Sequence, residues 1–166
     1  MRAEWSADFG REVPLYAGSG TLQRVALPQV AALTHNTWAT GTANGRFKLQ
    51  LAGWSAAELV ESAEGTLDFD WQNGVLTQVA LNDPGRPLRL KRFTGRAVLK
   101  DRRLQFEQSR IESPDGMYSV TGSASVSRLE LKFNDPKSHS YAISGTLEKP
   151  HVSLLPASET QAALGK

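Results

Sequence analysis

Residues 53–76 read GWSAAELVESAEGTLDFDWQNGVL, and this stretch predicts a short helix, a strand, a tight turn and a second strand. Ser55 and Glu58 have the spacing of a capping box, in which each residue's side chain bonds the backbone N–H of the other. The helix is expected over 56–63, and Gly65 supplies a left-handed stop after it. A helix this short makes the following strands the main structural element.

The strand that follows alternates apolar and polar side chains. Leu67, Phe69 and Trp71 have one parity, whereas the residues between them are polar, which is typical of a strand with one buried face. Asn73–Gly74 comes next, and both residues tolerate the positive φ of a two-residue type I′ turn. We therefore expect a hairpin that turns at Asn73–Gly74.

The same period of two recurs along the chain. Apolar residues alternate with polar ones at Phe47, Leu49 and Leu51, at Leu88 and Leu90, and at Leu129, Leu131 and Phe133. Turn-forming sequences lie between such runs at 43–45, 83–85, 114–116 and 134–136. This order predicts an antiparallel meander. One further helix is expected over 28–33, with proline at its first position.

One register conflict interrupts the alternation. Leu104 and Phe106 share a parity, but Ile111 has the opposite one, so this strand needs a β-bulge to keep all three side chains on one face. The sequence as a whole predicts a mainly β fold: a curved antiparallel sheet or incomplete barrel of roughly eight to ten strands, with one or two short helices.

Composition sets the remaining limits. The 166 residues, 40% hydrophobic and 22% charged, fit a single β domain over 1–155 followed by a flexible tail over 156–166. A net charge of +2 is too small to indicate nucleic-acid binding. The chain has no cysteine, which excludes disulfides and thiolate metal sites. The apolar segment 25–33 is too short to span a bilayer.

The sequence carries no catalytic signature. His35, His139 and His151 are scattered without the spacing of a zinc site, so we expect no metal and no cofactor. Asp68 and Asp70 have the parity opposite to the apolar side chains and are expected to face solvent. Neither a nucleophile elbow nor a phosphate-binding loop occurs. These absences favour a protein that is not an enzyme.

A basic run covers 86–103, with eight lysine and arginine residues. Arg89, Lys91 and Arg96 are its candidate contacts with anionic lipid headgroups, which cationic side chains attract. A solvated hairpin surface is the alternative, because the run includes both parities. Only one aromatic residue lies within it, which disfavours stacking on nucleic-acid bases.

The apolar face offers the candidate lipid contacts. They are Phe47, Leu49, Leu51, Leu67, Phe69 and Trp71. Alternation is consistent both with a closed core packed against a second layer and with an open groove that holds acyl chains.

The order of these motifs resembles the C-terminal region of the AsmA-like family of bacterial envelope proteins, related to the TamB-like lipid transporters. The similarity rests on the serine-capped helix, the Gly-Thr-Leu strand and the Asn-Gly pair of 53–76. It continues through FTGRAVL at 93–99 and ISGTLEKPHV at 143–152, and covers roughly Leu22 to Leu155. These motifs are weak individually and gain weight from their order.

The resemblance implies a function. AsmA-like proteins are inner-membrane-anchored proteins whose long β-sheet grooves conduct phospholipid across the periplasm. We therefore expect a periplasmic piece of a longer anchored protein, with phospholipid and envelope proteins as partners. Two alternatives remain open: a β-sandwich module that binds a protein through a free edge strand, and a small soluble carrier of lipid or lipoprotein.

Overall fold

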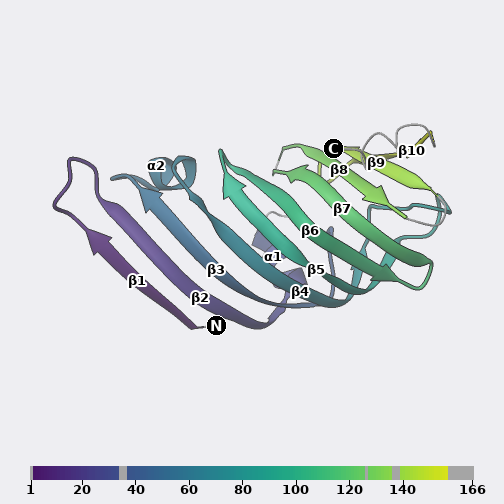
Figure 1. Cartoon of the computed structure of the whole chain (residues 1–166), viewed down its shortest axis with the longest axis horizontal. Helices are drawn as coiled ribbons and strands as arrows, with labels where there is room; N and C mark the ends of the chain where they lie inside the picture. The colour runs from purple at the N-terminus through teal and green to yellow at the C-terminus, as the bar shows by residue number, and fades with distance from the viewer. Residues whose placement is uncertain (1, 34–36, 126, 136–138, 157–166) are drawn as a thin grey trace.

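The computed structural model describes residues 2–33, 37–125, 127–135 and 139–156. Its elements in chain order are β1 (Arg2–Asp8), β2 (Leu15–Ala26), α1 (Leu27–Leu33), β3 (Thr42–Ala52), α2 (Ala56–Glu61), β4 (Glu64–Leu76), β5 (Leu88–Lys100), β6 (Arg103–Ser113), β7 (Gly116–Ala124), β8 (Leu129–Asn134), β9 (Ser140–Gly145) and β10 (Pro150–Leu155). All ten strands belong to one curved antiparallel sheet in strict chain order, with β1 and β10 at its two edges (Figure 1). The sheet is not closed. The expected mainly β fold with two short helices is confirmed.

Helix α2 begins as predicted and ends early. Ser55 Oγ accepts the Glu58 backbone N–H at 3.3 Å, and the Glu58 carboxylate accepts the Ser55 N–H in return, so the capping box is present. The helix ends at Glu61 and is capped by Ser62, whose hydroxyl accepts from the Ala52 N–H and donates to the Ala52 carbonyl, both at 2.7 Å. These bonds tie the chain back to β3. The predicted stop at Gly65 is wrong, because Gly65 lies within β4 and pairs with Leu49.

The hairpin predicted at Asn73–Gly74 is also wrong. Strand β4 continues to Leu76, and Gly74 pairs with Leu90 on β5. Asn73 does adopt the positive φ, 51°, that the sequence indicated. It uses that conformation inside a strand that stays paired with β5, so the chain turns only after β4 ends.

The turn expected over 43–45 is likewise absent, because these residues lie in β3. Asn44 Oδ1 instead accepts the backbone N–H of Arg24 at 2.9 Å. Arg24 has a φ of 50° and lies where the β2–β3 register shifts. The asparagine therefore satisfies a donor freed by a bulge in the neighbouring strand.

The bulge predicted in the strand that contains Ile111 is confirmed. The register of β6 shifts against both neighbouring strands, between Phe106 and Ser109 on the β7 side. Gln108 carries the distortion, with a φ of 47°. Ile111 is thereby returned to the apolar face, where it is fully buried.

The core lies on the apolar face of β4–β9. Its aromatic members, which we call the aromatic core, are Phe69, Trp71, Phe93, Phe106, Tyr118, Phe133 and Tyr141. Two connecting segments cover it. Trp38, which follows α1, packs edge-on against Trp71, and the β4–β5 connection places Asn82 where it accepts the Tyr141 hydroxyl. In the described part of the chain, neither helix is long and apolar enough to cross a bilayer.

Candidate functional site

The sheet has an apolar face and a polar face, which the strand registers define. Phe47 pairs with Leu67, and Leu67 pairs with Ala97, so these side chains share the apolar face. Asp68 and Asp70 lie on the polar face, as alternation predicts. They are not free carboxylates, because each forms an ion pair with an arginine of β5.

These ion pairs set the electrostatics of the polar face. Asp68 Oδ1 lies 2.7 Å from Arg96 Nε, and Asp70 Oδ2 lies 2.8 Å from Arg92 Nη2. In each case the arginine donates two hydrogen bonds to one carboxylate. Hydrogen bonding to Arg96 and to Arg92 therefore holds the pKa of Asp68 and of Asp70 below the usual value.

The three candidate headgroup contacts differ in their surroundings. Leu90 and Phe93 are both buried in the core, although they lie three residues apart on β5. The alternation of buried and exposed side chains along β5 therefore shifts by one residue between them. This change places the exposed Arg89 and Lys91 on the polar face together with Arg96. The charge of Arg96 is offset by Asp68, which leaves Arg89 and Lys91 as the more available cations of the three.

The predicted lipid contacts fall into two groups. Phe47, Leu49, Leu51 and Leu67 are half-buried and are not among the residues that form or pack against the core. Together with Trp5 of β1, which is 54% exposed, they form what we call the N-terminal apolar surface. This surface covers the apolar face of β1–β4.

Glycines determine the shape of the N-terminal apolar surface. A Cβ atom at Gly18 would lie 2.5 Å from the Trp5 ring, and one at Gly65 would lie 2.9 Å from Leu49 Cδ2. The large side chains therefore lie down over glycines of the neighbouring strands instead of standing up from the sheet. The result is a low apolar layer.

Phe69 and Trp71 form the second group and belong to the aromatic core. Trp71 is only 6% exposed, and its Nε1 donates to the Thr40 carbonyl at 2.8 Å. Phe69 is half-buried, with its ring centroid 4.9 Å from that of Phe93. The connecting segments thus close this part of the apolar face, so a lipid chain reaches Trp71 only if they move.

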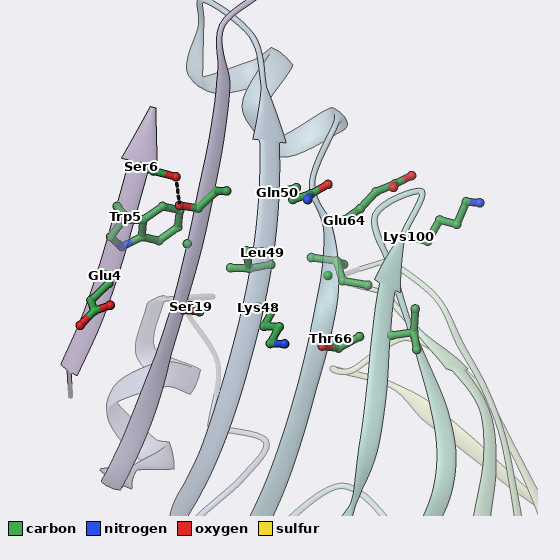
Figure 2. Close-up of a pocket in the computed structure, with 15 residues that line it drawn as sticks. Glu4, Trp5, Ser6, Ser19, Lys48, Leu49, Gln50, Glu64, Thr66 and Lys100 are labelled. Atoms are coloured by element: carbon green, nitrogen blue, oxygen red, sulfur yellow. Dashed lines mark hydrogen bonds between the residues drawn. The ribbon is translucent and has the colours of Figure 1, made fainter. Parts of the chain in front are cut away.

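A shallow depression of about 790 Å³ crosses the end of the sheet over β1–β5 (Figure 2). Residues of all five strands line it, among them Trp5 and Leu49 of the N-terminal apolar surface and the charged Lys48, Glu64 and Lys100. Leu49 is the one predicted lipid contact in its lining. The cross-strand row Trp5, Gly18, Leu49, Gly65 and Leu99 runs through the middle of this lining, which places the depression on the apolar face.

The histidines do not form a metal site in the part of the chain that the structure describes. No group of three or more histidine, aspartate or glutamate side chains there is arranged to hold a metal ion. His139 and His151 are exposed, and His35 lies outside the described residues, as does most of the tail predicted over 156–166.

Comparisons with family models, with curated proteins and with solved structures find no match for this chain. A functional proposal for this chain therefore has to start from its fold and from the two faces of its sheet. Sequence reasoning missed one residue of the N-terminal apolar surface, Trp5. The signal was present, because Ala3, Trp5 and Ala7 alternate with four polar residues at the start of the chain.

Proposed function

We propose that this chain is a non-enzymatic periplasmic segment of an inner-membrane-anchored, AsmA-like protein that supports phospholipid transport and outer-membrane integrity. The N-terminal apolar surface is the proposed contact for acyl chains. The observation that carries the proposal is that Phe47, Leu49, Leu51 and Leu67 lie together on one face yet outside the core.

The N-terminal apolar surface leaves apolar area in contact with water. Removing one methylene group of an acyl chain from water gains about 0.8 kcal/mol. A low layer of side chains laid over Gly18 and Gly65 offers such a chain an apolar contact across several strands. The order of the sequence motifs supports the same family, and the resemblance supplies the periplasmic location and the anchor.

Native mass spectrometry of the chain purified from bacteria tests the proposal. We expect copurified phospholipid, and we expect Leu49→Asp to lose it because a carboxylate would then lie in the apolar layer. Gln50→Asp is the matched control, since Gln50 is the exposed neighbour on the other face. A folded wild-type chain without lipid, or equal lipid on both variants, would contradict the proposal.

A second candidate function is a β-sheet module that binds another protein through a free edge. The closed aromatic core favours it, because Trp71 and Phe93 are already buried within the chain. This alternative predicts a stable, lipid-free protein. The same mass spectra distinguish the two functions.

A further inference from the structure

Strand β1 is an edge strand of the described sheet, and it has no proline, lysine or bulge. It pairs with β2 in unbroken register from Arg2 to Asp8, and no strand covers its outer side among the described residues. Natural edge strands are commonly shielded by charged side chains, especially lysine, by proline or by a bulge. The only such shielding on β1 is its three charged residues, Arg2, Glu4 and Asp8, whose signs allow them to pair with a second copy, whereas β10, at the other edge, begins with Pro150, which lacks an N–H to donate.

The side chains of β1 are sorted by face. Arg2, Glu4, Ser6 and Asp8 lie on the polar face, and Ala3, Trp5 and Ala7 lie on the apolar face. Trp5 is the middle residue of β1, which is the outermost strand of the sheet (Figure 2). A strand with this pattern pairs well only with a strand whose apolar side chains lie on the same face of the joined sheet and whose polar side chains lie on the other.

The sequence of β1 is complementary to itself when two copies run antiparallel with Trp5 at the centre. Arg2 then lies opposite Asp8 of the second copy, and the two-fold symmetry repeats that pair at the other end. Glu4 lies opposite Ser6 of the second copy, and the two Trp5 residues face each other. Opposite charges directly across a pair of strands stabilise it.

Other registers match the charges or the faces of the two strands less well. Moving the register by two residues places Glu4 opposite either Glu4 or Asp8 of the second copy, and like charges across a strand pair are destabilising. It also shortens the paired segment. Moving the register by an odd number of residues places Trp5 opposite a polar residue of the second copy, so the apolar face of one sheet adjoins the polar face of the other. The register centred on Trp5 alone pairs the whole strand and matches its charges.

We propose that this chain forms a two-fold symmetric dimer in which the β1 strands of two copies pair antiparallel and join the two sheets into one. Main-chain hydrogen bonds supply the contact, and the Arg2 and Asp8 pairs fix its register. The proposal does not depend on lipid binding. It also brings the two N-terminal apolar surfaces together at the junction, with Trp5 at its centre.

The local contacts of Asp8 are compatible with this pairing. Its Oδ1 accepts the Gly10 N–H at 2.9 Å, and its Oδ2 accepts from Arg11 Nε at 3.2 Å. An ionised carboxylate has about four acceptor sites, so it can accept from Arg2 of the second copy as well. Pairing of β1 with β10 of another copy is less favourable, because His151, Ser153 and Leu155 offer no matching charges.

Sedimentation equilibrium of the chain provides the first test. We expect a mass of twice the 18.1 kDa of one chain as concentration rises. In Arg2→Glu, the new carboxylate lies opposite Asp8 of the second copy at each end of the strand pair. This repulsion should raise the dimer dissociation constant about tenfold. Lys132→Glu changes the net charge equally on the interior strand β8 and should leave the dissociation constant unchanged.

Disulfide trapping tests the register. The natural chain has no cysteine, so a single Trp5→Cys substitution places one thiol directly opposite its copy, within the Cα separation that a disulfide tolerates. We expect oxidation to give a covalent dimer. Ala7→Cys is the control, because its thiols would lie roughly 14 Å apart, four residues along the strand. A monomer at all concentrations, a larger oligomer, or equal cross-linking of both variants would overturn the proposal.

Discussion

Phe69 on β4 and Phe106 on β6 contact each other across β5, with their ring centroids 6.0 Å apart. Neighbouring strands are about 4.8 Å apart, so two rings separated by a strand meet at this distance by leaning over it. The residues of β5 beneath them are small: Gly95 pairs with Phe69, and Ala97 pairs with Phe106. Close packing of the aromatic core therefore depends on the absence of side-chain volume at these positions.

Gly95→Ala should destabilise the fold, because the added Cβ would overlap the side chain of Ser109. Overpacking of this kind typically costs about 1–3 kcal/mol. Urea denaturation measures the loss in the free energy of unfolding. Gly85→Ala is the control, since its added Cβ would meet no atom closer than 3.6 Å. Equal stability of the two variants would contradict the packing described for β5.

Trp71→Ala should cost about 3–5 kcal/mol of the free energy of unfolding, the usual range for a buried aromatic. It removes the edge-on contact with Trp38 and the hydrogen bond to the Thr40 carbonyl. Trp54→Ala removes a tryptophan that is 68% exposed and should change stability far less. Thermal denaturation compares the two variants. A mild effect at Trp71 would mean that the covering segment does not close the core.

The ion pair of Asp70 with Arg92 predicts a pH dependence. Hydrogen bonding to Arg92 lowers the pKa of Asp70 in the folded protein below its ordinary value of 3.8. The pair therefore stabilises the fold above that value, and its contribution is lost as the pH falls through the lower, folded pKa. In Arg92→Gln the pKa of Asp70 should rise, as measured by NMR titration of its carboxyl carbon. Arg89→Gln should not change it.

The bulge at Gln108 predicts a position-specific effect of β-branched residues. A β-branched side chain tolerates positive φ poorly, so Gln108→Val should destabilise the fold at a φ of 47°. Gln105→Val is the control, because Gln105 is exposed and lies in regular register with Val98. Denaturation should find Gln108→Val the less stable variant. The reverse order would place the extra residue of β6 elsewhere.

Local chemistry and periodicity predicted a large part of this fold. The capping box at Ser55 depends on residues three apart, and the bulge before Ile111 follows from parity alone, so both were visible in the sequence. The alternation at Phe47 and Leu67 likewise assigned side chains to the correct faces. These features require no knowledge of which strands are neighbours.

Features that depend on distant partners were not predictable. Asn73 has the positive φ that its sequence indicated, but pairing with β5 keeps the chain in a strand. Trp71 and Leu67 have the same parity in β4, yet Trp38 covers Trp71 and does not cover Leu67. Periodicity assigns a side chain to a face, but it does not say which connecting segment folds over that face. The division of the apolar face into closed and open parts therefore came from the structure.

Site-specific photo-cross-linking at four consecutive positions of β3 tests whether lipid contacts the apolar face of the sheet. A photoreactive amino acid would replace Phe47, Lys48, Leu49 or Gln50 in turn, and cross-linked phospholipid would be counted by mass spectrometry after expression in bacteria. We expect lipid adducts at 47 and 49 and few at 48 and 50, because only the first two lie on the apolar face. Adducts at none of the four positions, or at all four alike, would contradict it.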